Sequence, residues 1–111
     1  MDKLERYRRI LKEIIEYYGN LQSSVGNVDT YAICDEKTDN YLVLDVGWLA
    51  FGRQHAIPVH LRLKDNKIWI EWDGTDQEIA QQLIDAGVDE NDIVDGFRQS
   101  AKSEEVELIA A

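Results

Sequence analysis

Apolar residues recur at helical spacing near the start of the chain and at alternating spacing through its middle. Within residues 2–18 they fall three or four positions apart and form one stripe, which predicts an amphipathic helix. Gly19-Asn20 follows directly, and this pair favours the end of the helix. The stripe consists of Leu4, Tyr7, Leu11, Ile14 and Tyr18, widened by Ile10 and Ile15.

Four β-like runs come next. The connections between them, EKTDN, LAFGRQ and KDN, are short and polar or contain glycine, which suits an antiparallel meander. In the second run the apolar residues at even positions, from Leu42 to Trp48, share one face. Pro58 lacks an N–H group, so its strand is expected at an edge or with this position pointing outward. The runs are 28–34, 41–48, 55–63 and 67–72.

The chain changes character after the fourth run. Thr75 is expected to cap a helix over residues 76–86, because a threonine oxygen can accept from the free N–H groups of the first turn. Asp89 is expected to cap a second short helix over residues 90–97. Asp92 then occupies the third-residue position of a capping box. The tail is polar until VELIAA, a candidate closing strand.

This order of elements predicts an α+β fold. It has an N-terminal helix, a four-stranded, mostly antiparallel meander sheet, then two short helices and a tail, with the helices packed on one sheet face. No internal repeat, low-complexity tract or linker divides the sequence. Residues 1–111 are therefore expected to form a single domain.

Composition narrows the possible partners. Hydrophobic residues make up 44% of the chain, and 22 acidic against 12 basic residues give a net charge of −10. This charge opposes unaided binding to nucleic acids and to anionic membranes. No apolar stretch approaches the roughly 20 residues that span a bilayer. The charged N-terminus lacks the apolar run of a signal peptide, and Cys34 has no second cysteine to pair with. A soluble, cytoplasmic protein with Cys34 as a small buried strand residue is expected.

The string Asp73-Gly74-Thr75 follows an apolar run and resembles the DxDGT signature of haloacid-dehalogenase-type phosphatases. In that signature the first Asp is the nucleophile, and Glu71 holds its position here. Gly74 suits a tight turn and Thr75 a cap, so we interpret the string as a turn. A small hydrolase that uses Glu71 and Asp73 is the disfavoured alternative.

Other groups of reactive residues do not indicate a particular metal or catalytic site. His55 and His60 differ by an odd number along one run, so a regular strand would direct them to opposite faces and prevent shared metal binding. Trp72 has the parity of Ile68 and is expected in the core, whereas Trp69 lies beside Glu71 on the other face as a candidate protein contact. No catalytic, cofactor or metal site is predicted.

Charge is segregated along the chain. Nine acids and no Lys or Arg lie between Lys67 and Arg98, while the first helix carries five basic residues within ten positions. Such an acidic run would attract a basic partner protein. The acids are Glu71, Asp73, Asp76, Glu78, Asp85, Asp89, Glu90, Asp92 and Asp95. The candidate partner-binding residues are Trp69, Glu71, Asp73, Asp76, Glu78 and Asp92.

Two expectations concern association. Tyr41, Val43 and Trp69 form an odd-position face that three short helices would leave uncovered, which favours a homodimer. The basic residues of the first helix are expected to pair with nearby acids at helical spacings and to bind no DNA alone. The basic residues are Arg6, Arg9 and Lys12, and the acids are Glu5, Glu13 and Glu16.

The segment MDKLERYRRILKEII is followed in order by YLVLDVGW, HLRLKDNKIWIEWDGT and IAQQLIDAGVDENDIVDGF. Together they resemble the XisI family, the fdxN-element excision controlling factors of cyanobacteria, over residues 1–97. The resemblance implies a non-enzymatic accessory protein that supports site-specific excision of a DNA element through an XisH-like protein partner. An acidic, antitoxin-like inhibitor of a nuclease-related partner is the alternative.

Overall fold

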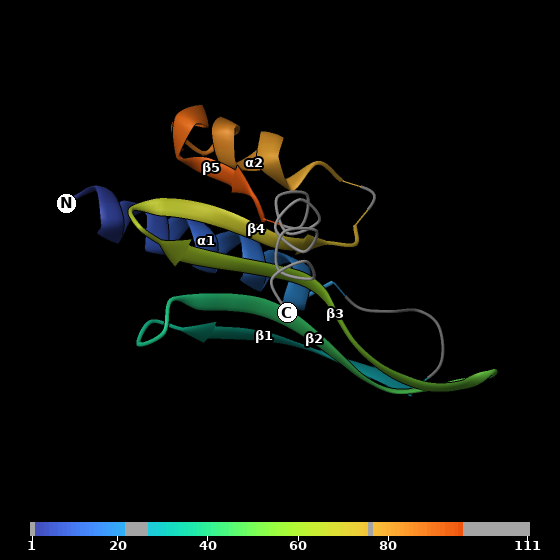
Figure 1. Ribbon diagram of the computed structural model, residues 1–111. Coiled ribbons are helices and arrows are strands. Elements are labelled where there is room, and N and C mark those ends of the chain that lie inside the picture. Colours follow the sequence, from blue (N-terminus) through green and yellow to red (C-terminus); the bar gives the residue numbers. More distant parts are fainter. Residues whose placement is uncertain (1, 22–26, 76, 97–111) are drawn as a thin grey trace, which may run out of the picture.

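The computed structural model describes residues 2–21, 27–75 and 77–96, in which a long helix lies across one face of a five-stranded sheet (Figure 1). The strand order follows the chain, β1-β2-β3-β4-β5; β1 to β4 pair antiparallel, and β5 pairs parallel with β4. The elements are α1 (Lys3–Gly19), β1 (Asn27–Asp35), β2 (Asn40–Leu49), β3 (Gly52–Lys64), β4 (Lys67–Asp73), α2 (Ile79–Asp85), the 3-10 turn η1 (Glu90–Asp92) and β5 (Ile93–Asp95).

The α+β class, the N-terminal helix and the antiparallel meander are confirmed, but the sheet has a fifth strand in the described residues. The helix expected over residues 90–97 is wrong. Asp89 does cap a turn there, with its side chain accepting from the N–H of Asn91, but that turn is the short η1. Ile93 then starts β5 opposite Ile68, so the free edge of β4 overrides the local helical pattern. The predicted closing strand in VELIAA lies outside the described residues.

The core lies between α1 and the sheet. The predicted stripe is confirmed in its centre, where Tyr7, Leu11 and Ile15 have no exposed surface. They form one cluster with side chains from β2, β3, β4 and α2. The end of α1 is fixed by a close approach to β1, since a Cβ atom on Gly19 would lie 2.6 Å from the Cβ of Ala32.

The sheet face that α1 covers is the opposite of the one expected to be covered. Tyr41 is 0% exposed and Val43 2% exposed, so the odd positions of β2 belong to the core. The expectation that this face is uncovered is wrong. Leu42 and Leu44 alternate with these residues on the other side of β2 and are half-buried. On that side of β1, Tyr31 is 49% exposed opposite Leu44.

Two β-bulges in β3 and its partners reverse the expected alternation. Leu61 pairs with Ile70 but His60 pairs with Trp72, which leaves Glu71 as the extra residue of β4. Trp72 therefore leaves the core face and is 52% exposed, so the expectation that it is buried is wrong. The other irregularity lies in the segment of β3 that contains Pro58, where a missing N–H is tolerated.

The start of α2 also differs from the prediction. The helix begins at Ile79 rather than at residue 76, and its N-cap is Glu78, whose side chain makes no capping hydrogen bond. Thr75 instead stabilises the preceding turn: its hydroxyl oxygen accepts from the N–H of Gln77 at 3.2 Å. Thr75 therefore stabilises the turn before α2 rather than the first turn of the helix. Asp76 lies outside the described residues.

Candidate protein-contact surfaces

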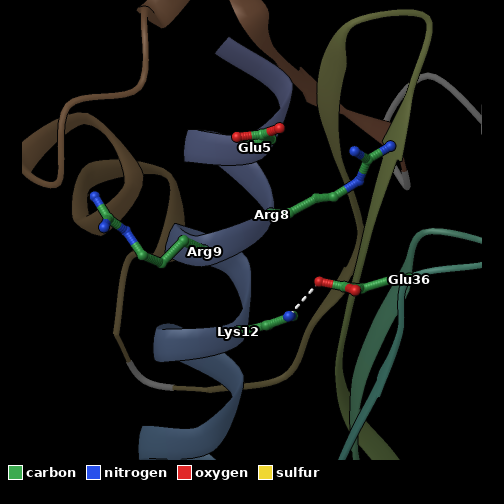
Figure 2. Close-up of a pocket in the computed structure, with 5 residues that line it drawn as sticks. All are labelled: Glu5, Arg8, Arg9, Lys12 and Glu36. Carbon is green, nitrogen blue, oxygen red and sulfur yellow. Dashed lines mark ion pairs between the residues drawn. The ribbon is translucent and has the colours of Figure 1, made fainter. Parts of the chain in front are cut away.

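The basic residues of α1 are largely engaged within the molecule. Lys3 pairs with Asp92 at 2.9 Å, and Lys12 pairs with Glu36 across a hollow of about 570 Å³ (Figure 2). Arg6 donates to the carbonyl of Gly87 at 3.5 Å. The expected partners within the helix are not the ones that Arg6 and Lys12 use, because Gly87 after α2 and Glu36 in the β1–β2 turn reach the helix from distant parts of the chain.

Asp39 in the β1–β2 turn holds the middle of this basic helix. Arg8 donates to both of its carboxylate oxygens, at 2.9 and 3.1 Å, and the hydroxyl of Tyr41 donates to Oδ1 at 2.9 Å. The guanidinium of Arg8 lowers the pKa of Asp39 below its ordinary value, and the Tyr41 hydroxyl adds to this effect. Arg8 is thus committed to a bidentate pair rather than available to phosphate.

Asp92 joins η1 to α1. Its Oδ2 accepts from the hydroxyl of the fully buried Tyr7 at 2.7 Å and pairs with Lys3. The same Tyr7 oxygen accepts from the N–H of Asp89 at 3.3 Å. The Tyr7 hydrogen bond, followed by that of Lys3, lowers the pKa of Asp92. This carboxylate therefore fastens the chain before β5 onto the helix.

The Asp73-Gly74-Thr75 string forms a turn. Asp73 Oδ1 accepts from the N–H of Thr75 at 3.0 Å and from its hydroxyl at 2.7 Å, and Oδ2 accepts from the N–H of Ile79 at 3.5 Å. Glu71 pairs with Arg62 at 2.5 Å. Local structure thus uses both carboxylates that the hydrolase alternative requires. Asp73 also supplies the side-chain acceptor at the start of α2 that was expected from Thr75.

The predicted partner-binding residues occupy different places in the fold. Trp69 and Glu71 alternate with the core residues of β4, and the Trp69 indole N–H donates to the carbonyl of Lys64 at 3.1 Å. Asp92 instead contacts α1 on the core side of the sheet, and Glu78 is exposed before α2. The described members of the set therefore do not form one continuous patch, although Trp69 and Glu71 share a face.

The two histidines lie on one face, contrary to expectation. His55 pairs with Val46 and His60 with Leu42, two positions of equal parity in β2, because the irregularity near Pro58 shifts the alternation. Four residues of β2 separate those pairings, a span of about 13 Å, which is too long for one metal ion. In the described part of the chain, no three His, Cys, Asp or Glu residues gather in a way that could hold a metal.

Exposed side chains gather at the β2–β3 turn, where the sequence pattern predicted no site. Phe51 is 86% exposed and Trp48 59% exposed. The guanidinium of Arg53 lies 5.5 Å from the Trp48 ring and donates to the carbonyl of Gly47 at 3.3 Å. The available signal was two aromatic residues in and beside the polar connection LAFGRQ. We call Trp48, Phe51 and Arg53 the hairpin tip.

These features define a one-sheet α+β protein with exposed aromatic side chains at the β2–β3 turn. No helix in the described ranges is long and apolar enough to cross a membrane. The chain matches the XisI protein family over residues 1–108 and belongs to that family.

Two solved structures from Anabaena variabilis resemble the chain. The fdxN element excision controlling factor XisI has 39% sequence identity and a TM-score of 0.75, with 86% of this chain and 93% of that chain covered. A XisI-like protein has 29% identity and a TM-score of 0.77, with coverages of 85% and 86%. No curated protein matches the sequence.

Proposed function

We propose that this protein is a non-enzymatic accessory factor that supports site-specific excision of a DNA element by binding an XisH-like protein partner. The observation that carries this proposal is the likeness to the fdxN element excision controlling factor, which extends over most of both chains at 39% identity. The likeness covers 86% of this chain and 93% of that chain, which supports a role of the same kind for this chain.

The electrostatics favour action through a protein rather than direct contact with DNA. Of the five basic residues in α1, Lys3, Arg8 and Lys12 are paired with carboxylates and Arg6 donates to a backbone carbonyl. Phosphate would have to displace these partners against a net charge of −10. Binding to DNA is therefore assigned to the partner or the recombinase.

Co-purification tests the association. The XisH-like protein, carrying an affinity tag, is co-expressed with the native chain, and a stoichiometric complex on size exclusion is the expected result. An excision reporter with the recombinase and the element then compares cells with and without this protein. Absence of a complex, or equal excision in both cells, would contradict the proposal.

The exposed acids favour a second candidate, an antitoxin-like inhibitor of a nuclease-related partner. Glu78, Asp85, Asp89 and Glu90 are exposed on and around α2 and η1. Such a group of carboxylates can imitate a phosphate backbone for a basic nuclease cleft. The same complex distinguishes the two functions: inhibition of DNA cleavage by the bound partner supports the inhibitor, and promotion of excision supports the accessory factor.

A further inference from the structure

The β2–β3 hairpin extends beyond the part of the sheet that β4 reaches. Pairing between β3 and β4 begins at Val59, whereas β2 and β3 stay paired as far as Leu49 and Gly52. In Figure 1 this end of the hairpin runs away from α2 and β5. The three aromatic and basic side chains of the hairpin tip are therefore presented at the end of an arm.

The base of this arm is tightly packed. A Cβ atom on Gly47 would lie 2.0 Å from the carbonyl oxygen of Asn27, so the backbones of β1 and β2 touch there. Arg53 bonds back to the Gly47 carbonyl and stacks on Trp48. The ring of Trp48 is thereby oriented before any partner arrives, which lowers the entropy cost of binding.

Exposure at the hairpin tip requires an explanation. Phe51 at 86% and Trp48 at 59% are among the most exposed large hydrophobic side chains in the described residues. Neither position contributes to the core cluster. Trp and Arg are the residue types most enriched among those that dominate protein–protein binding energy, and contiguous exposed apolar groups mark interaction sites.

The charge of the arm indicates what it meets. From Val46 to Lys64 there is no Asp or Glu, although the chain as a whole carries −10. Arg62 in this stretch is neutralised by Glu71. On β1 the exposed Asp29 lies opposite Val46, two residues from Trp48, so Arg53 is the basic residue at the tip and one acidic residue lies beside the arm. A single arginine is too little to hold a nucleic-acid backbone against the net charge. It does suit an apolar pocket with a carboxylate at its rim.

We propose that the hairpin tip is a docking arm that inserts Trp48 and Phe51 into an apolar pocket of a protein partner, with Arg53 meeting carboxylates at the pocket rim. This inference rests on the proposed function in requiring a protein partner. It assigns the contact to the β2–β3 turn rather than to the acids around α2.

Titration calorimetry with the purified XisH-like protein tests the arm. The double variant Trp48→Ala/Phe51→Ser is expected to bind at least about thirty-fold more weakly than the native chain. Arg53→Glu is expected to weaken binding about tenfold and to reduce its dependence on salt. The matched control is Tyr31→Ala, which removes a 49% exposed aromatic side chain from the sheet face opposite α1 and is expected to change affinity less than threefold.

Each outcome decides the inference. Native affinity in the double variant, or a larger loss in Tyr31→Ala, overturns the docking arm while leaving the proposed function intact. If the native chain does not bind the XisH-like protein, both fall together. The single variant Phe51→Ser tests whether the double variant loses binding through misfolding, because so exposed a side chain contributes little to the core. Sedimentation of the protein alone and a duplex-DNA titration complete the test: self-association or DNA binding that the double variant abolishes would assign the tip to another occupant and overturn the proposal.

Discussion

Replacing Tyr7 by Phe tests how η1 and β5 are held to α1. The substitution keeps the buried ring and removes a hydroxyl that donates to Asp92 at 2.7 Å and accepts from Asp89 at 3.3 Å. A hydrogen bond to a charged group contributes about 1.5–3 kcal/mol. The Asp92 side chain is 16% exposed and keeps Lys3 as a partner, so we expect a loss near the lower end, about 2 kcal/mol.

Urea denaturation measures this loss. With a slope of about 2 kcal/mol per molar, the midpoint falls by about 1 M. Tyr17→Phe is the matched control, because Tyr17 is 55% exposed on the same helix, and it is expected to change stability by less than about 0.5 kcal/mol. Equal midpoints for the two variants would refute the assignment of a stabilising role to the buried hydroxyl.

The pH dependence of this difference supplies a second test. The pKa of Asp92 is lowered in the folded protein, so its contribution is fully present above the unfolded pKa of about 3.9. That contribution disappears as the pH falls through the lower folded value. The native chain and Tyr7→Phe are therefore expected to converge in stability in acid. A difference that grows below pH 4 would contradict this origin.

Three further predictions follow from the contacts. Gly19→Ala is expected to lower the free energy of unfolding by about 1–3 kcal/mol, because its new Cβ meets Ala32 at 2.6 Å; a gain in thermal midpoint, as helix propensity alone predicts, would disprove the steric reason. Thr75→Ala is expected to cost about 1 kcal/mol in urea unfolding through loss of its bonds to Asp73 and Gln77, with partner binding retained; loss of binding with unchanged stability would contradict the turn. Anisotropy titration of duplex DNA with the protein alone at physiological salt is expected to be flat, and salt-sensitive micromolar binding would refute the internal pairing of α1.

Local patterns predicted most of the fold because they depend on neighbouring residues. The stripe from Tyr7 to Ile15 and the strand runs carried their own periodicity. The exposure of Trp72 could not be predicted, since it depends on a bulge set by pairing with His60 on another strand. β5 was missed for a related reason: Ile93 begins a strand only because the free edge of β4 lies beside it.

The candidate surfaces were predicted less well, because they depend on which side chains remain free after folding. Asp73 and Asp92 were predicted to bind a partner because of their charge. In the fold the carboxylate of Asp73 accepts from the Thr75 hydroxyl and that of Asp92 from the Tyr7 hydroxyl. Phe51 and Arg53 can be read directly from the sequence, but their exposure depends on how far the hairpin extends beyond β4. The periodicity of apolar residues does not indicate how far one strand extends beyond its neighbour in the sheet.

The strand order has a consequence for how the chain folds. Successive strands from β1 to β4 are sheet neighbours joined by short turns, so these pairings close with little loss of chain entropy. β5 reaches β4 only after residues 74–92 have crossed over, and the Tyr7–Asp92 bond joins positions 85 residues apart. We therefore expect the antiparallel meander to form early and the α2–η1–β5 segment to dock late. In native-state hydrogen exchange the same segment should open first, at a free energy below that of global unfolding.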